Sequence, residues 1–397
     1  MSSSAGFDRA IDFARDLIRI PGLSGEERGV AERVKEEMDA LGFVDVHIDE
    51  IGNVMGRIPG GRGAPIMLSC HLDAVDVGDA GTWEHGPFDA DLDAHFLHGR
   101  GAMDIKGPLA IQTHAAATFL DRHAPADIWV AHTVYEERGG WGMEHLLESG
   151  RVKPAAVIIG ESTNGDVCIG HRGRAEVIVE IEGVAGHASA PDRASNPLAL
   201  LPALIPALTR FAADLPSDAV LGASTLAPTM IQTLPRSRNV IPDRVQVVCD
   251  WRVLPTMTAD DVVIMLRDSL DREMPVPPPF RLHVRPGLEM HRAWTGRAEE
   301  RRLFTPGFLI DPHHPVVRAA AETIGQRTGR VPAVRPWTFA TDGGHTCGVH
   351  GIPTIGYAPG EERHAHTNEE RLDLAAARIA FDAYPYLIEA VLGAVQD

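Results

Sequence analysis

Three almost uninterrupted apolar runs restrict the fold of this chain more than any other feature of its sequence. They cover residues 66–70, 128–134 and 155–159, and helical patterns stand between them. A strand with apolar side chains on both faces has to be covered on both sides, as in a parallel sheet between layers of helices. The alternation of such strands with helices predicts an α/β fold with a mostly parallel sheet covered by helices.

The pattern changes near residue 173. Residues 175–181 alternate apolar and charged side chains, which is typical of a strand with one solvent-facing side. Two helical patterns and three more strand patterns follow, and the first pattern returns after residue 307. We therefore expect a smaller α+β insert of the split-βαβ (ferredoxin-like) type. The predicted division is a first domain at 1–178 and 295–397, interrupted by the insert at 179–294.

Composition narrows the possible partners. The chain has 397 residues and a formal net charge of −18, and a surface this acidic repels nucleic-acid phosphates and anionic lipids. We expect neither nucleic acid nor a membrane as a partner. The four cysteines form no CxxC pair, so free thiols in a reducing compartment are expected. Without a signal-peptide pattern or a long apolar run, the expected location is the cytoplasm.

Each of the three apolar runs stops at side chains that can bind a metal or move a proton. His71 and Asp73 follow the first run, Glu136 and Glu137 the second, and Glu161 the third. Ligands bind at the carboxyl ends of strands in open α/β sheets. Adjacent buried carboxylates are costly unless a cation or a proton pairs with them. Taken singly, each of these segments could equally be a solvated loop.

Two further segments complete the pattern. Asp104 lies in a glycine-flanked loop before a helix, where it could also be only a helix cap, and His364 and His366 stand in a late acidic segment. Together the five segments supply enough imidazoles and carboxylates for two divalent metals. Such donors without thiolates suit zinc, with manganese or cobalt as alternatives.

These motifs resemble those of the co-catalytic zinc amidohydrolases and exopeptidases, the family of succinyl-diaminopimelate desuccinylase, acetylornithine deacetylase, aminoacylase and carboxypeptidase G. The resemblance extends over essentially the whole chain, and its motifs are HxD at 71–73, GRGAxDxKG at 99–107, EE at 136–137, GEST at 160–163 and HTNEE at 366–370. Residues 337–341 and 350–360 are similar to a selenium-metabolism-linked hydrolase branch. The resemblance implies a zinc exopeptidase-like catalytic domain and a lid or dimerisation role for the insert.

The resemblance also implies a role for each motif residue. Asp104 would bridge two metals, with His71 and Glu161 completing one site and Glu137 and His366 the other.

Asp73 would orient the histidine of the first site, and Glu136 would be the general base. His364 competes with His366, whose spacing fits the family better. His187 matches a histidine that reaches into the site of a partner subunit, which implies a homodimer through the insert; the alternative is a simple turn residue.

Substrate binding is implied to involve an anion. Asn239 and Arg252 match family positions that hold a substrate carboxylate, and Arg172 is a further candidate. Arg252 could instead only pair with Asp250 on the sheet. Thr341 stands where the family has a glycine-rich loop that lines the pocket, although the glycines are shifted here.

The expected function is a metal-dependent hydrolase that cleaves the amide bond of an N-acyl amino acid or a small peptide-like substrate. A metal-activated water would attack, with a glutamate as general base. One alternative is a dipeptidase or carboxypeptidase, and another is an aminohydrolase that deaminates a small amine. The remaining alternative is a metal-binding protein without catalytic activity.

Overall fold

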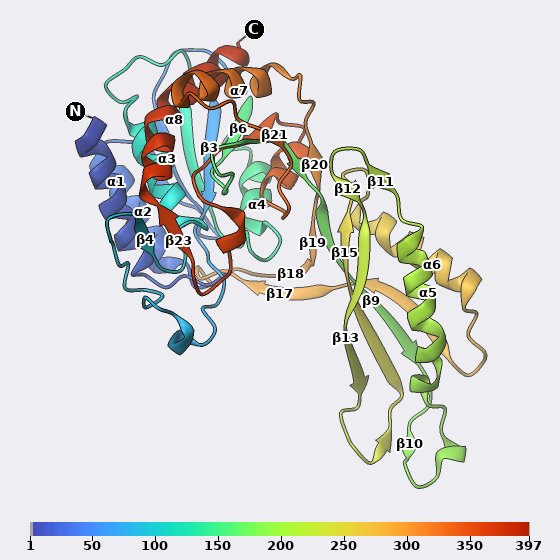
Figure 1. The fold of residues 1–397 in the computed structure, drawn as a ribbon. Helices are drawn as coiled ribbons and strands as arrows, with labels where there is room; N and C mark the ends of the chain where they lie inside the picture. Colours follow the sequence, from blue (N-terminus) through green and yellow to red (C-terminus); the bar gives the residue numbers. More distant parts are fainter. Residues whose placement is uncertain (1–2, 397) are drawn as a thin grey trace. The chain divides into compact units, whose positions relative to one another are not determined.

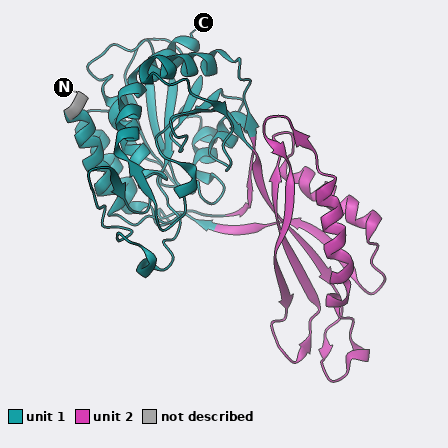
Figure 2. Cartoon of the chain, in the orientation of Figure 1, with its two compact units in different colours: residues 1–171, 291–299, 308–397 teal, residues 172–290, 300–307 magenta. Residues whose placement is uncertain are grey.

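The computed structural model describes residues 3–396, and the chain forms two compact units (Figures 1 and 2). Unit 1 comprises residues 1–171, 291–299 and 308–397, and unit 2 comprises residues 172–290 and 300–307. We expected the insert at 179–294. Unit 2 begins earlier because β9 (Gly173–Glu182) pairs along its whole length with another strand of that unit. Residues 291–299 belong to unit 1, where Ala293 is part of the hydrophobic core.

An eight-stranded sheet lies at the centre of unit 1 (Figure 1). In spatial order its strands are β1 (Val44–Ile48), β2 (Val54–Ile58), β5 (Ile128–Thr133), β3 (Ile66–His71), β6 (Ala156–Ile159), β22 (Thr354–Gly356), β7 (Val167–Cys168) and β21 (Val334–Arg335). The four strands β5, β3, β6 and β22 run parallel, while β1 and β2 add antiparallel partners on one side. The predicted α/β layer is therefore confirmed.

The central strands are buried on both faces of this sheet. In β3, Ile66 and Leu68 belong to one hydrophobic core, and Met67 between them belongs to another. Val157 and Ile158 of β6 are divided between the two cores in the same way. Since successive side chains of a strand point to opposite faces, a strand between two cores needs apolar residues at every position.

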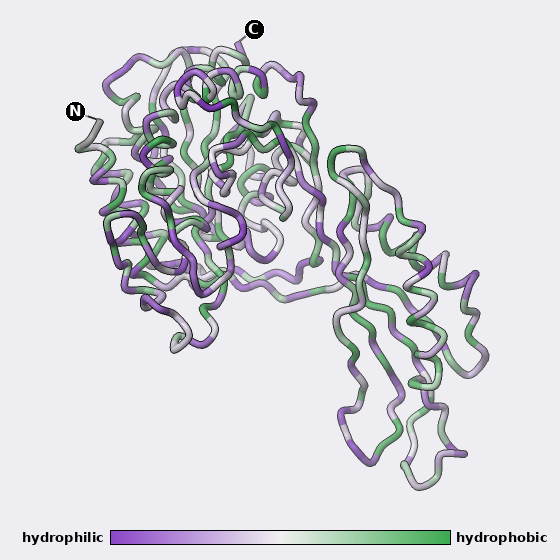
Figure 3. The backbone as a smooth tube through the Cα atoms, in the orientation of Figure 1, coloured by the Kyte–Doolittle hydropathy of each residue, from purple (hydrophilic) through white to green (hydrophobic). Residues whose placement is uncertain are grey.

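Six helices cover the sheet. Their bounds are Ser3–Ile18 for α1, Arg28–Leu41 for α2, Lys106–Ala117 for α3, Trp141–Ser149 for α4, Pro315–Thr328 for α7 and Leu374–Ala394 for α8. Helix α4 contributes Trp141 to the core that contains Ile66 and its other buried apolar side chains to the core that contains Met67, and the other five helices contribute to the core that contains Ile66. Hydrophilic and hydrophobic stretches alternate along α1 and α2 (Figure 3), as expected for helices with one buried face.

The beginning of α2 does not follow the local sequence pattern. Ser24 and Glu27 have the spacing of a capping box, in which the serine would cap the helix. Instead, Glu27 is the residue before the helix and makes no side-chain capping bond. The Ser24 hydroxyl donates to the carboxylate of Asp73 at 2.6 Å. A contact with a distant segment has replaced the local bond.

Unit 2 has the predicted split-βαβ architecture. Its main sheet has the order β13 (Thr225–Leu234), β15 (Arg244–Val253), β9 and β16 (Arg281–Pro286), and β19 (Phe304–Thr305) also pairs with β9. Helices α5 (Leu201–Ala213) and α6 (Ala259–Glu273) pack against its strands (Figure 1). Across residues 3–396, no helix combines the length and the apolar character that crossing a lipid bilayer would require.

Candidate metal centre

The candidate centre lies in unit 1, where three neighbouring parallel strands end. β3 ends at His71, β5 is followed by Glu136 and Glu137, and β6 is followed by Glu161. Because β3 pairs in parallel with both β5 and β6, these side chains meet at one edge of the sheet. This edge is where open α/β sheets bind their ligands.

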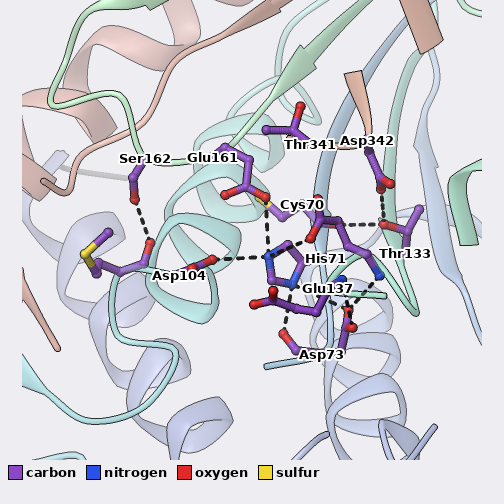
Figure 4. Close-up of polar contacts among 12 residues, drawn as sticks. Cys70, His71, Asp73, Asp104, Thr133, Glu137, Glu161, Ser162, Thr341 and Asp342 are labelled. Atoms are coloured by element: carbon purple, nitrogen blue, oxygen red, sulfur yellow. Dashed lines mark hydrogen bonds and ion pairs between the residues drawn. The ribbon is translucent and has the colours of Figure 1, made fainter. Parts of the chain in front are cut away.

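A first group of donors is formed by His71, Asp104 and Glu161 (Figure 4). The Nε2 atom of His71 lies 3.3 Å from Oδ1 of Asp104 and 3.3 Å from Oε1 of Glu161. One donor atom from each residue lies within 4.8 Å of the other two, and all three side chains are largely buried.

A second group uses the other oxygen of Asp104. Its Oδ2 atom lies 3.2 Å from Nε2 of His366, which is also 3.0 Å from Oε1 of Glu137. Donor atoms of these three residues again lie within 4.8 Å of one another. His364 belongs to neither group and lies in a short 3-10 helix that ends before His366.

The backbone carbonyl of Asp73, rather than only its carboxylate, orients His71. The Nδ1 atom of His71 lies 2.8 Å from this carbonyl oxygen, and it is 3.5 Å from the Asp73 carboxylate. This contact holds the proton on Nδ1, so that the lone pair of Nε2 is available to bind a metal ion. The Asp73 carboxylate accepts hydrogen bonds from the backbone N–H groups of Glu136 (3.1 Å) and Glu137 (3.2 Å). It therefore holds the two glutamates in place.

Glu370 has a supporting role that the sequence reasoning missed. This fully buried carboxylate accepts hydrogen bonds from the backbone N–H groups of Met103 (3.2 Å) and Asp104 (3.1 Å), and it pairs with Arg100 at 2.6 Å. It links the loop that presents Asp104 to the segment that presents His366. The signal was available, because Arg100 and Glu370 are both part of the motifs quoted above.

Electrostatics show that this cluster attracts positive charge. Burial raises the pKa of Glu161 to about 7, and it also raises the pKa values of Glu136 and Glu137. Burial would raise the pKa of Asp104 as well, but hydrogen bonds with two histidines outweigh it and lower that pKa. Hydrogen bonds with Asp104 and Glu137 raise the pKa of His366 to about 10. Carboxylate and imidazole donors crowded in this way are suited to divalent cations.

A cavity of about 270 Å³ opens onto the cluster. Its lining consists of four acidic residues of the cluster, Asp104, Glu136, Glu137 and Glu161, together with Thr338, Phe339, Ala340, a fifth acidic residue, Glu362, and Ala365 and His366. We expected Thr341 in this lining, and the structure corrects that expectation. Thr341 is fully buried, and its hydroxyl lies 3.1 Å from Nε2 of His171. The three residues before it face the cavity instead.

The remaining predicted substrate residues belong to unit 2. Arg252 lies 2.9 Å from the Asp250 carboxylate, so the simple ion pair that we considered as an alternative is present. Arg172 donates to a backbone carbonyl of the same unit at 2.6 Å. The side chain of Asn239 accepts a hydrogen bond from a nearby serine at 2.8 Å, and His187 is exposed in a two-residue strand.

Two histidines and several carboxylates are grouped around one aspartate at the carboxyl edge of a covered α/β sheet, an arrangement suited to a metal-dependent hydrolase. The chain belongs to the Peptidase family M20/M25/M40, whose family profile matches residues 67–390. It is thus an enzyme of the metallopeptidase and amidohydrolase class, as the resemblance implied.

Relatives with curated sequences match nearly the whole chain, and two of them serve as examples. The uncharacterized protein YgeY of Escherichia coli (strain K12) is 31% identical over 363 residues, which are 90% of this chain and 88% of YgeY. Succinyl-diaminopimelate desuccinylase of Methylorubrum extorquens (strain PA1) is 30% identical over 401 residues, covering 94% of this chain and 97% of that enzyme.

Solved structures share the fold. The M20 family metallo-carboxypeptidase Sso-CP2 from Sulfolobus solfataricus matches with a TM-score of 0.77 at 17% identity, over 97% of this chain and 99% of that one. The YXEP protein of Bacillus subtilis, a dinuclear metal binding peptidase, matches with a TM-score of 0.71 at 17% identity, over 98% and 99% of the two chains.

Proposed function

We propose that this protein is a two-metal amidohydrolase that releases an amino acid from a small N-acyl substrate. The observation that carries the proposal is the position of Asp104. One of its carboxylate oxygens faces His71 and lies in the same donor group as Glu161, and the other faces His366 in the group of Glu137. A carboxylate in this position can hold two cations at the same time.

The donor set favours zinc as the metal, with manganese or cobalt as alternatives, because it combines imidazoles and carboxylates without a thiolate. Two such cations, when bound, would polarise the amide carbonyl and supply an activated water. The dinuclear YXEP peptidase, which shares the fold, supports a stoichiometry of two per chain.

Glu136 is the carboxylate left for proton transfer, because it belongs to neither donor group. Its side chain is 9% exposed, and one oxygen lies 4.0 Å from Nε2 of His71. We propose that it takes a proton from the attacking water and delivers that proton to the leaving nitrogen. Burial raises its pKa, which helps the carboxyl group to hold the proton between these two steps.

The test combines metal content with activity. We expect about two metals per chain and hydrolysis of N-acyl amino acids that stops on chelation and returns with zinc, manganese or cobalt. Glu136→Gln should lower kcat by at least about 100-fold with the metal content unchanged. Glu148→Gln, at an exposed position of α4, should have no effect. Loss of activity in both variants, or folded protein that binds no metal, would contradict the proposal.

The substrate residues of unit 2 support a homodimer. The backbone carbonyl of Asn239 accepts a hydrogen bond from the backbone N–H of Ala188, directly after His187, and β10 (Gly186–His187) lies at one end of unit 2 (Figure 1). Arg252 lies at the other end, near the end of the ten-residue strand β15. Such a strand is roughly 30 Å long, so Arg252 and the pair His187 and Asn239 cannot hold one substrate within one chain. We propose that His187 and Asn239 serve the site of a second copy.

The exposed edge of unit 2 is the surface proposed for this dimer. β13 is the edge strand of its sheet, with β15 as its partner on one side only within residues 3–396. Met230 and Ile231 in β13 are each 51% exposed. An edge strand with exposed apolar side chains is suited to pairing with another chain.

Mixing two inactive variants tests this arrangement. His187→Ala and Glu136→Gln subunits should together regain about a quarter of the wild-type activity, because half of the dimers are mixed and each has one complete site. Glu136→Gln mixed with Glu161→Gln should regain none. Recovery in neither mixture would contradict the shared site.

We also propose that the substrate carries a carboxylate, and that Arg252 and Asn239 from two different chains bind it. The proposed location is the cytoplasm, which is consistent with four free cysteines, three of them buried.

A further inference from the structure

Three of the non-acidic residues that line the cavity, Thr338, Phe339 and Ala340, form a short segment that is held at both ends. Trp337 is buried, and its indole N–H donates to the backbone carbonyl of Ser162 at 3.0 Å. On the other side, the backbone N–H of Thr341 donates to Nε2 of His171 at 3.0 Å. Residues 338–340 between these anchors therefore present a fixed surface to the cavity.

Phe339 is the largest apolar side chain of this segment. Its ring is half-buried and packs against the core that contains Trp337, with the two ring centroids 6.4 Å apart. Ala340 and Ala365 add two methyl groups to the same lining. A group bound beside the metal cluster thus meets a rigid hydrocarbon surface.

The lining has no cation available for a second carboxylate. Glu362 pairs with Arg335 at 2.7 Å and accepts a hydrogen bond from Thr338 at 2.9 Å. Arg335 also pairs with Asp166 at 3.0 Å, so its charge is already satisfied. No lysine or arginine is among the described residues that line this cavity.

The charge balance of the site with two metals bound also disfavours a second carboxylate on the substrate. Two divalent cations would offset the charges of the four carboxylates that form the cluster, and His366 would be neutral as a ligand. Nothing in the lining would then compensate an extra negative charge on the substrate. A carboxylate moved into such a cavity loses its hydration without gaining a partner.

We propose that Phe339 makes this enzyme selective for a compact, neutral, apolar acyl group, and that acyl groups with a second carboxylate, such as succinyl, are rejected. The inference rests on the proposed amide hydrolysis. It separates this chain from the desuccinylase that is 30% identical to it.

The experiment compares kcat/KM of the metal-loaded enzyme for N-acetyl, N-isobutyryl and N-succinyl derivatives of one amino acid. We expect kcat/KM for both neutral acyl groups to exceed kcat/KM for succinyl by at least about tenfold, because the succinyl carboxylate would lose its hydration without gaining a partner. Phe339→Lys should shift the ratio of succinyl to isobutyryl by at least about tenfold in favour of succinyl. Ala340→Lys, which adds the cation one residue along, should shift the ratio in the same direction.

Two controls separate selectivity from damage. Val349→Lys adds the same charge at a position that is 59% exposed and should leave the ratio unchanged. Phe339→Leu keeps an apolar surface and should retain the preference for neutral groups, with two metals per chain in every variant.

Equal or better hydrolysis of the succinyl substrate by the wild-type enzyme would overturn the inference while leaving amide hydrolysis intact. Unchanged ratios in both lysine variants would overturn the role of Phe339. If the metal-loaded enzyme cleaves no amide at all, the proposed function fails, and this inference fails with it.

Discussion

Replacing Glu27 by glutamine should make the protein more stable at neutral pH. Glu27 is fully buried before α2, and burial and the nearby Asp73 carboxylate raise its pKa from 4.5 to about 8. One of its oxygens accepts a hydrogen bond from the backbone N–H of Tyr135 at 3.3 Å. The other has no hydrogen-bond partner within residues 3–396. Glutamine keeps the accepting oxygen and removes the ionisation.

The sign and the magnitude follow from the two pKa values. Between pH 4.5 and about 8 the folded protein holds the proton of Glu27 and the unfolded chain releases it. The free energy of unfolding therefore falls with rising pH by about 1.4 kcal/mol per pH unit in this window. At pH 7 the accumulated loss is about 3 kcal/mol relative to a side chain that stays neutral. Glu27→Gln should recover this amount at pH 7 and almost nothing at pH 4.5.

Urea unfolding of the metal-loaded protein at pH 5, 6, 7 and 8 measures this effect. The difference between wild type and Glu27→Gln should widen with pH, and contributions from groups that do not interact with Glu27 cancel in that difference. Glu36→Gln, at an exposed position of the same helix, should give a constant difference. Parallel curves for wild type and Glu27→Gln would show that Glu27 is ionised in the folded protein, and would refute the reasoning.

Three further changes have definite outcomes. His366→Ala should reduce the metal content from two to about one per chain, because the second donor group loses its imidazole; two retained metals would argue against His366 as a ligand. Gly356→Ala places a Cβ atom 1.9 Å from the ring of Trp337, so it should lower the free energy of unfolding in urea by about 3 kcal/mol. Gly393→Ala is the control, because the added Cβ atom there has no neighbour within 4 Å. Arg100→Leu leaves the Glu370 carboxylate buried without its cation, so it should lower the free energy of unfolding by about 3–5 kcal/mol. A decrease below about 1 kcal/mol would show that this ion pair does not stabilise the fold.

The strand ends were predictable because two independent properties coincide there. Continuous apolar runs indicate strands covered on both faces, and parallel strands bring their carboxyl ends to one edge. The sequence alone therefore predicts that His71, Glu137 and Glu161 lie near one another. Asp104 and His366 lie in loops, so no strand pattern fixes their positions. Their residue types suggested that they belong to the same set of ligands, and the resemblance to a family assigned each of them a role.

What remained hidden depends on contacts between distant segments. Ser24 and Glu27 have the spacing of a capping box. In the structure, however, the serine hydroxyl donates a hydrogen bond to Asp73, and the glutamate side chain is buried. Thr341 directly follows the residues that line the cavity, but its side chain points into the protein interior, where its hydroxyl forms a hydrogen bond with His171. Phe339 could not be recognised as part of the cavity, since no pattern in the sequence reports which side of a loop faces a ligand.

The position of β22 also has a consequence for synthesis of the chain. β22 (Thr354–Gly356) lies between β6 and β7 in the sheet, although β6 ends at Ile159. Residues 160–353, including all of unit 2, have to be made before β22 exists. At 5–20 residues per second this takes roughly 10–40 s. During that interval the apolar strand β6 has an unpaired edge, and growing chains can associate wrongly through such an edge.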